Sequence, residues 1–382
     1  MTENRVRYHD YFITAGVGAL FYSGVTLFKY AAGADERAFY SLGVYFLQTG
    51  EYYSPKHHPL YAILIGLSSS LGVSALGAAK MAFVFSGVIL WMSVYSIFVL
   101  MGGDSFRCRL FQTIFVGTLP GTASLILYSG SSVLYMAMAA ASIALTLYAL
   151  TTDSRGLYVL CGALYGLTYL ARLDGLILFG LLGIYLLLSG GRVGRDQLFL
   201  MVLGFIIAIL PWQLYLYING LYLSTVIQGG WSSAVWVDGP MKYIVSANGG
   251  FQFHADNLSN ILSAFSKNVL LYTQHLPSIR VFPFFYMVFI GFIFLSRENL
   301  SRFAIICLPV IATLPYLLFY VEARYLAPAA LFMAVLSAIG LSNMIGFLKA
   351  KSAPIYLALI CLNLVLVVSY LIFGHETYAP YR

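Results

Sequence analysis

The feature that most constrains this chain is a series of apolar runs, such as Met81–Met101 and Ile355–Phe373. A helix needs about twenty mainly apolar residues to cross the hydrocarbon core of a bilayer, and these runs have that length. Inside the core every backbone N–H and C=O must be paired within the segment, so such runs are expected to be helices. Of the 382 residues 60% are hydrophobic and only 9% charged, whereas a soluble domain carries about a quarter charged residues. The sequence shows no period-two alternation of the kind that marks a β-barrel.

We therefore predict an all-α polytopic membrane protein, a single transmembrane domain over residues 1–382 with about eleven transmembrane helices. The expected spans are approximately residues 11–29, 79–101, 108–127, 131–150, 157–171, 175–189, 198–218, 279–295, 303–320, 326–346 and 354–373. A further apolar stretch, 60–71, is about a dozen residues long and too short to span.

The basic residues favour a topology in which 60–71 does not cross. Every short loop on one side of the membrane then contains Lys or Arg, as the positive-inside rule requires of the cytoplasmic side. The residues concerned are Arg5, Arg7, Arg107, Arg109, Arg155, Arg192, Arg195, Arg297, Arg302, Lys349 and Lys351. The N-terminus is thus predicted in the cytoplasm and the C-terminus outside, in an inner or plasma membrane. The net charge of +7 is explained by these scattered topology signals, and no nucleic-acid partner is expected.

Two long loops are then expected on the outer face, 30–78 and 219–278. The first contains an amphipathic stretch, 38–49, with apolar residues at helical spacing. We expect this stretch and 60–71 to be interfacial helices lying in the membrane plane.

Charged residues kept near membrane depth are costly and are functional candidates by default. On the expected outer face these are Asp35, Glu36, Lys56, His57, His58, Arg172, Asp174, Glu322 and Arg324. An acid after the first span, with cations at the ends of others, suits an anionic lipid-linked substrate and a carboxylate base. Simpler explanations stay open: the acids could start an exposed helix, and Arg172 and Arg324 could pair with neighbouring acids. Adjacent histidines point in different directions, so no metal site is predicted at His57 and His58.

Four motifs in order resemble those of the C-type membrane glycosyltransferases (GT-C), which use polyprenyl-phosphate sugars and include protein O-mannosyltransferases and an aminoarabinose transferase. An acidic pair, Asp35-Glu36, is followed by Tyr40, Leu47 and Gly50. Then come Lys56-His57-His58-Pro59-Leu60-Tyr61, Tyr169-Leu170-Ala171-Arg172, and Glu322-Ala323-Arg324-Tyr325-Leu326-Ala327-Pro328. The chain departs from the family at His58, where a proline is usual, and in having no sequence for a soluble C-terminal domain. Acceptor recognition is then expected to fall to loop 219–278 or to the membrane.

The resemblance implies an inverting glycosyltransferase that moves a hexose or pentose from a polyprenyl-phosphate donor to an acceptor hydroxyl on the outer, extracytoplasmic face. Asp35 would be the catalytic base, with Glu36 as its helper or as a ligand of the acceptor. Lys56, His58, Arg172 and Arg324 would bind the donor phosphate, and His57, Asp174, Glu322 and Tyr325 would support the acceptor or the site. No cofactor is expected, and a divalent metal stays an open alternative.

The expected partners are the lipid-linked donor, the bilayer, and an acceptor that is a glycan, a lipid or a protein. The alternative function is a flippase or transporter of lipids or lipid-linked sugars, which should show two related halves with interrupted helices and charges near the midplane. A non-enzymatic scaffold would not need an acid and several cations on one face. A metal-dependent oligosaccharyltransferase should show a second acidic cluster on the outer face, and the sequence has none there.

Overall fold

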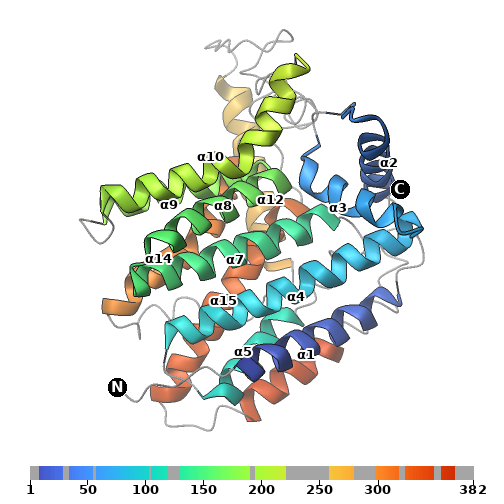
Figure 1. Ribbon diagram of the computed structural model, residues 1–382. Coiled ribbons are helices and arrows are strands. Elements are labelled where there is room, and N and C mark those ends of the chain that lie inside the picture. The colour runs from blue at the N-terminus through green and yellow to red at the C-terminus, as the bar shows by residue number, and fades with distance from the viewer. Residues whose placement is uncertain are drawn as a thin grey trace.

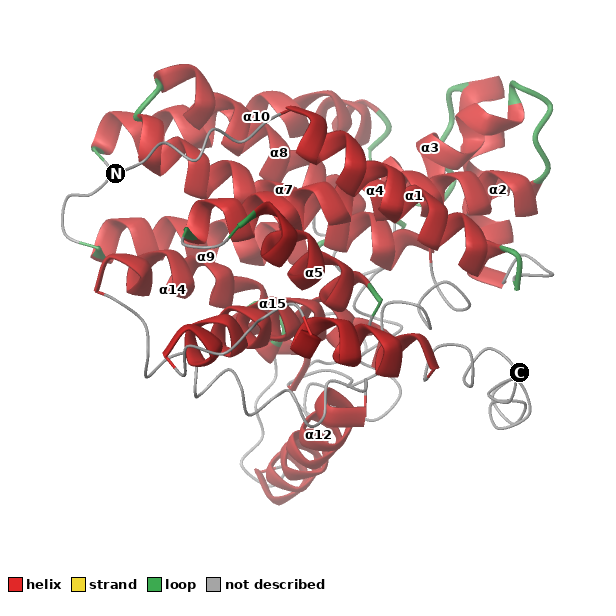
Figure 2. Ribbon diagram, turned by 90° about the horizontal axis from the view of Figure 1, so that it is seen from below, coloured by secondary structure: helices red, strands yellow, loops and turns green. Residues whose placement is uncertain are grey.

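The structure is a computed structural model that describes residues 8–28, 34–54, 57–102, 105–118, 130–189, 194–220, 258–278, 297–317, 323–347 and 354–365. The regular structure of this part of the chain is helical throughout (Figures 1 and 2), which confirms the all-α prediction. The elements are α1 (Tyr8–Thr26), α2 (Ala34–Thr49), α3 (Pro59–Ser69), α4 (Ala75–Met101), α5 (Phe106–Gly117), α7 (Gly130–Thr152), α8 (Arg155–Ala171), α9 (Asp174–Leu188), α10 (Arg195–Ile218), α12 (Leu258–Ser278), α14 (Arg297–Ile311), the 3₁₀ turn η3 (Leu314–Leu317), α15 (Ala323–Phe347) and the helix Pro354–Val365.

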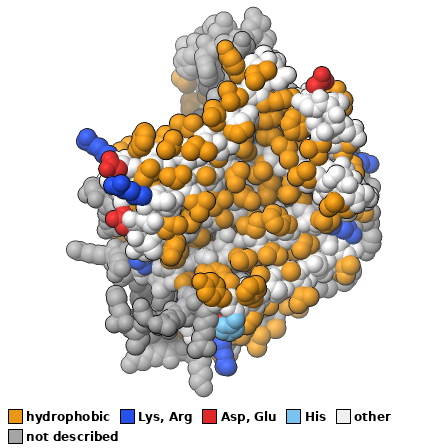
Figure 3. All heavy atoms as spheres, in the orientation of Figure 1, with side chains coloured by type: hydrophobic (Ala, Val, Ile, Leu, Met, Phe, Trp, Pro, Cys, Tyr) orange, Lys and Arg blue, Asp and Glu red, His pale blue; other side chains and the backbone are white. Residues whose placement is uncertain are grey.

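Five segments of the described residues are both long and apolar enough to cross a bilayer: Ala75–Met101, Ser131–Thr152, Arg195–Ile218, Asn299–Leu317 and Pro328–Ile345. Each coincides with an expected span. The total of about eleven stays a prediction, because the expected span 279–295 lies outside the described residues. Figure 3 shows apolar side chains spread over the face that carries α10, as expected of a surface that contacts lipid.

Glycines let the helices of the bundle approach closely. A Cβ at Gly162 of α8 would overlap the backbone of Met201 on α10, and one at Gly204 of α10 would overlap the carbonyl of Val159. The two backbones therefore touch along this pair, as small residues allow in membrane helices.

The predicted topology places the loops that carry basic residues at one end of the bundle, and contacts between helix termini are found there. Arg302, in α14, donates a hydrogen bond of 2.7 Å to the carbonyl of Leu100, near the end of α4. Gln197, at the start of α10, contacts Asp153 between α7 and α8. This end therefore gathers the helix termini that carry Arg155, Arg195 and Arg302. The side of the membrane that it faces stays a prediction.

The expected interfacial segments are both helices. Acids in the first turn suit the start of α2, where they face the positive end of the helix dipole. Pro59 begins α3, because proline lacks the N–H that a first-turn residue leaves unpaired. A Cβ at Gly43 of α2 would overlap the carbonyl of Ala62 in α3, so these two helices also touch backbone to backbone.

Part of the expected outer loop 219–278 is a helix, α12 (Leu258–Ser278). Its serines, asparagines and single lysine lower the mean hydropathy below that of a span, so a search for long apolar runs passes over it. Residues 221–257 of that loop lie outside the described residues.

Candidate active site

A sharp turn between α8 and α9 positions two of the predicted site residues. The backbone of Arg172 is extended, with φ −160° and ψ 148°, and α9 begins two residues later at Asp174. Only glycine fits at position 175, since a Cβ there would overlap the backbone of Thr168 and Tyr169. The turn therefore places a guanidinium and a carboxylate beside each other at the end of the bundle opposite Arg155.

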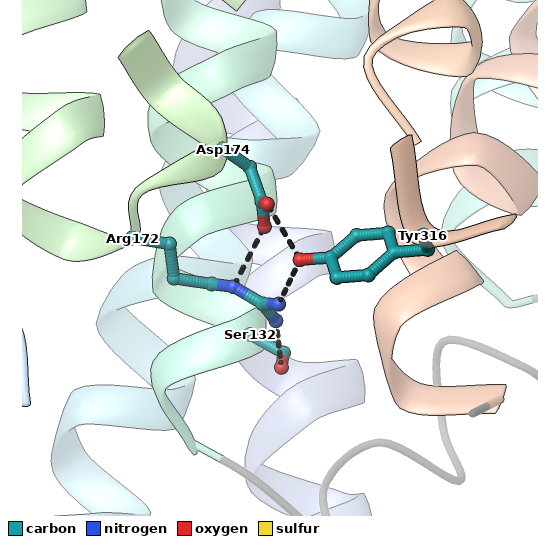
Figure 4. A network of polar contacts seen from close by, with 4 residues as sticks. All are labelled: Ser132, Arg172, Asp174 and Tyr316. Carbon is teal, nitrogen blue, oxygen red and sulfur yellow. Dashed lines mark hydrogen bonds and ion pairs between the residues drawn. The ribbon is translucent and has the colours of Figure 1, made fainter. Parts of the chain in front are cut away.

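Four residues from four segments form a polar network at this turn (Figure 4). Arg172 Nε lies 3.0 Å from Asp174 Oδ2, and its Nη1 donates to Ser132 Oγ at 2.9 Å. Its Nη2 donates to the hydroxyl of Tyr316 at 3.0 Å, and that hydroxyl donates to Asp174 Oδ1 at 2.5 Å. The guanidinium also lies over the ring of Tyr135, 5.5 Å from its centroid. The pairing of Arg172 with Asp174, one of the two roles considered for them, is thus present.

His58 precedes α3 and lies beside this network. Its ring meets the ring of Tyr169 edge-on, with 5.7 Å between the centroids. Burial, together with the smaller effects of the positive charges of Arg172 and His57, lowers the pKa of His58 to about 3. His58 is therefore neutral at physiological pH, and it would contact a phosphate as a hydrogen-bond donor rather than as a cation.

An aromatic cluster of Phe46, Tyr52, Trp212 and Tyr215 fixes the segment that carries both histidines. The backbone N–H of Tyr52 donates to the hydroxyl of Tyr215, in α10, at 2.5 Å. The hydroxyl of Tyr52 donates to the carbonyls of His57 and His58, at 3.1 and 3.3 Å. The ring of Tyr52 packs edge-on against Trp212, with 4.9 Å between centroids. The segment before α3 is thus held on the end of α10.

The two predicted catalytic acids have different surroundings. The side chain of Asp35 is exposed, whereas Glu36 is buried, with 3% of its surface accessible. Glu36 lies close enough to Tyr61 for its charge to help raise the pKa of that phenol, after the larger effect of burial. Phe39 then links this region to the histidines, because its ring packs edge-on against both Tyr61 and His57. Helix α2 therefore presents one acid to solvent and one to the protein.

Several predicted site residues lie outside what the structure describes. Lys56 and Glu322 are not among the described residues, and only the helical backbone is described for Arg324 and Tyr325. Their predicted roles stay predictions. Within the described residues no group of three His, Cys, Asp or Glu side chains could hold a metal ion.

The sequence analysis missed Ser132 and Tyr316. Neither is charged, and Tyr316 lies in an apolar stretch, so nothing in the local pattern marks them. Tyr316 reaches Asp174 across 142 positions of sequence, and only packing reveals such a contact. Gln213 did carry a weak signal, as a polar residue near the end of an apolar helix, and it donates to the hydroxyl of Tyr169 at 3.2 Å.

No protein-family model matches the chain, and no curated protein sequence matches it either. The fold is similar to solved structures. One is ArnT from Cupriavidus metallidurans bound to undecaprenyl phosphate, with a TM-score of 0.60 and 16% identity over 89% of this chain and 63% of that one. Another is the oligosaccharyltransferase of Archaeoglobus fulgidus in complex with Zn and sulfate, with a TM-score of 0.50 and 14% identity over 94% of this chain and 51% of that one.

This chain spans less than two thirds of the length of either protein. Both are membrane glycosyltransferases of the GT-C group, the group that the sequence motifs resemble. At this level of identity, the similarity shows that the chain has the same helical architecture as these proteins. The fold therefore resembles the same group as the sequence motifs do. The chain is a polytopic helical membrane protein with a GT-C-like fold.

Proposed function

We propose that this chain is a membrane glycosyltransferase that transfers a sugar, with inversion, from a polyprenyl-phosphate donor to an acceptor hydroxyl on the extracytoplasmic face. The observation that carries the proposal is the position of Arg172. It lies at a helix end, held by Asp174, Ser132 and Tyr316 beside His58, in a fold shared with an enzyme bound to undecaprenyl phosphate.

The proposed transfer reaction requires few groups besides a catalytic base and the residues that bind the donor phosphate. The acceptor oxygen attacks the anomeric carbon as the bond from that carbon to the phosphate oxygen breaks, and a carboxylate takes the hydroxyl proton. Negative charge grows on the departing polyprenyl phosphate, which Arg172 and a neutral His58 can stabilise through hydrogen bonds. A phosphate is a good leaving group without protonation, so one base is sufficient.

Asp35 is the proposed base, with Glu36 in support. Its exposed carboxylate at the start of α2 is accessible to an acceptor that arrives from the aqueous side. Lys56 and Arg324 are proposed as further phosphate ligands, and His57, Asp174, Glu322 and Tyr325 as supporting residues. The acceptor is proposed to be a glycan, a lipid or a protein, in the inner or plasma membrane that holds the enzyme.

The test is complementation of a deletion strain, with mass analysis of its surface glycans and lipids. The wild-type gene should restore the missing sugar, and Asp35→Asn should not, because the amide keeps the size of the side chain but cannot accept the proton. Glu51→Gln is the matched control, since Glu51 is an exposed acid of the same loop that accepts a hydrogen bond from the hydroxyl of Tyr45. Restoration by Asp35→Asn would remove Asp35 from the mechanism.

Binding by purified protein separates the donor site from the base. Undecaprenyl phosphate should stabilise the wild type and Asp35→Asn equally against heat. It should stabilise Arg172→Lys less, because lysine lacks the planar fork that binds a phosphate. Failure of undecaprenyl phosphate to bind the wild type would refute the proposed donor class. Transport of a lipid-linked sugar with no transfer of it would favour the flippase alternative.

A further inference from the structure

Helix α12 carries a stripe of apolar side chains that the described protein leaves uncovered. Leu258, Leu262, Phe265 and Val269 follow one another at intervals of four, three and four residues, which places them on one face of the helix. Between 36% and 56% of the surface of each is exposed. We call these four residues the α12 stripe.

Between residues 258 and 270, the remainder of α12 divides into two other sides. Ile261, Ala264 and Asn268 are buried or half-buried, and the helix packs through this side against α15 and η3. The third side is mainly polar: Lys267 and the serines at positions 259, 263 and 266 are exposed, as is Leu270, and Lys267 lies opposite the stripe on the helical wheel. A helix with separate apolar and polar exposed sides is typical of a membrane interface.

The helix is long enough to cross a bilayer, since 21 residues rise about 31 Å. Its composition is nevertheless not that of a span, and it is not among the five candidate spans of the described residues. Figures 1 and 2 show α12 running across the direction of α4 rather than along it. Helix α4 is a candidate span, so α12 is oriented to lie in the plane of the membrane.

Helix α12 is joined to the end of a candidate membrane span. The side-chain amide of Asn268 donates to the carbonyl of Leu317 at 2.9 Å, which joins α12 to the end of the candidate span Asn299–Leu317. That span exposes Ile311 and Leu314, at 41% and 45% of their surfaces. The span to which α12 is joined therefore also exposes apolar side chains, as expected of a surface that faces lipid.

We propose that the α12 stripe inserts into the hydrocarbon edge of the lipid leaflet next to the site, so that phospholipid acyl chains cover it. Asn268 then fixes the level of η3 relative to the membrane, and Tyr316 of η3 belongs to the Arg172 network. The candidate site is therefore held at the membrane surface by a helix that lies in that surface. This inference rests on the membrane fold and not on the proposed glycosyltransferase activity.

The test uses a photoreactive side chain on either side of α12 in the full chain. Phe265→p-benzoylphenylalanine places it in the stripe, and Lys267→p-benzoylphenylalanine places it on the opposite side, two residues away. Each variant is reconstituted in phosphatidylcholine nanodiscs, irradiated and analysed by mass spectrometry. Lipid adducts should be about five-fold or more abundant at position 265 than at position 267. Melting temperatures close to the wild type establish that both variants are folded.

Three outcomes would overturn the proposal. Equal lipid adducts at the two positions would mean that α12 does not present one face to the bilayer. Adducts to a second copy of this chain at position 265 would mean that a protein interface covers the stripe. If iodide quenches a bimane label at Leu262→Cys as strongly as one at Lys267→Cys, in a background without native cysteines, the stripe faces water.

Discussion

The hydroxyl of Tyr316 should contribute measurably to the stability of the folded protein. It donates to a carboxylate oxygen of Asp174 at 2.5 Å and accepts from Nη2 of Arg172 at 3.0 Å, so both of its partners are charged. The side chains of those partners are 10% and 12% exposed, which leaves little access for water to replace the hydroxyl. Tyr316→Phe removes this one oxygen and keeps the ring.

The expected loss follows from the kind of hydrogen bond. A bond to a charged group contributes about 1.5–3 kcal/mol to stability, against about 1 kcal/mol for a neutral one. Arg172 and Asp174 keep their own pair at 3.0 Å in the variant, so the loss should lie in the lower half of that range, at about 2 kcal/mol. For a chain of 382 residues, with an unfolding entropy of about 2.1 cal/mol/K per residue, such a loss lowers the melting temperature by about 2.5 °C.

The assay is thermal unfolding of purified protein in one detergent, with two matched Tyr→Phe variants. Tyr185→Phe removes a hydrogen bond to the neutral carbonyl of Ser301, 3.1 Å away, and should cost about half as much as Tyr316→Phe. Tyr217→Phe alters a residue that is 72% exposed and should have almost no effect. If the Tyr316→Phe and Tyr217→Phe proteins have the same melting temperature, the role of this hydroxyl in the network is refuted.

Three further predictions concern other parts of the structure. The pKa of His58 is about 3 in the folded protein, against 6.5 for an unperturbed imidazole, so only the unfolded state takes up this proton between those pH values. Stability should therefore fall by at most about 1.4 kcal/mol per pH unit as the pH drops below 6.5. His58→Gln should remove that part of the slope in urea unfolding at pH 5 to 7, and an unchanged slope would contradict the burial of a neutral ring. Gly43→Ala should destabilise the protein by about 2 kcal/mol or more, because the new methyl group overlaps the backbone of α3. Gly24→Ala is the control, since there is open space around that position, and equal melting temperatures of the two variants would count against the close contact of α2 and α3. A reporter fused after Arg382 should be active only outside the cytoplasm, and cytoplasmic activity would overturn the predicted topology.

The five candidate spans were predictable because length and hydropathy alone decide them. The expected span 79–101 is α4, which starts slightly earlier, at Ala75, where Ser74 caps the helix by accepting from the N–H of Gly77 at 3.3 Å. The short segment 60–71 is α3, displaced by one or two residues because Pro59 fixes its start. In both cases a local rule of helix ends explains the remaining difference.

Local rules did not predict which face of a helix packs against the rest of the protein. Asp35 and Glu36 are adjacent, so they point about 100° apart around α2. The sequence predicts that both begin a helix, but it does not tell which one faces the protein. The packing of α2 against α3 decides this, and that packing depends on Gly43 and on residues later in the chain. The α12 stripe, by contrast, follows a helical period that is present in the sequence. A search for long apolar runs does not detect this period, because polar residues separate the apolar ones.

Pairing with Asp174 and binding a phosphate are compatible roles for Arg172. Asp174, Ser132 and Tyr316 each contact a different nitrogen of Arg172, and a guanidinium has five N–H groups in one plane. Contacts from three sides fix the orientation of that plane before any ligand arrives, which lowers the entropic cost of binding. Asp174 offsets part of the positive charge, so an anion would be attracted less strongly than by an isolated arginine. The site would then depend on directed hydrogen bonds more than on net charge, and this is why Arg172→Lys, which keeps the charge and loses the geometry, is the variant that separates the two contributions.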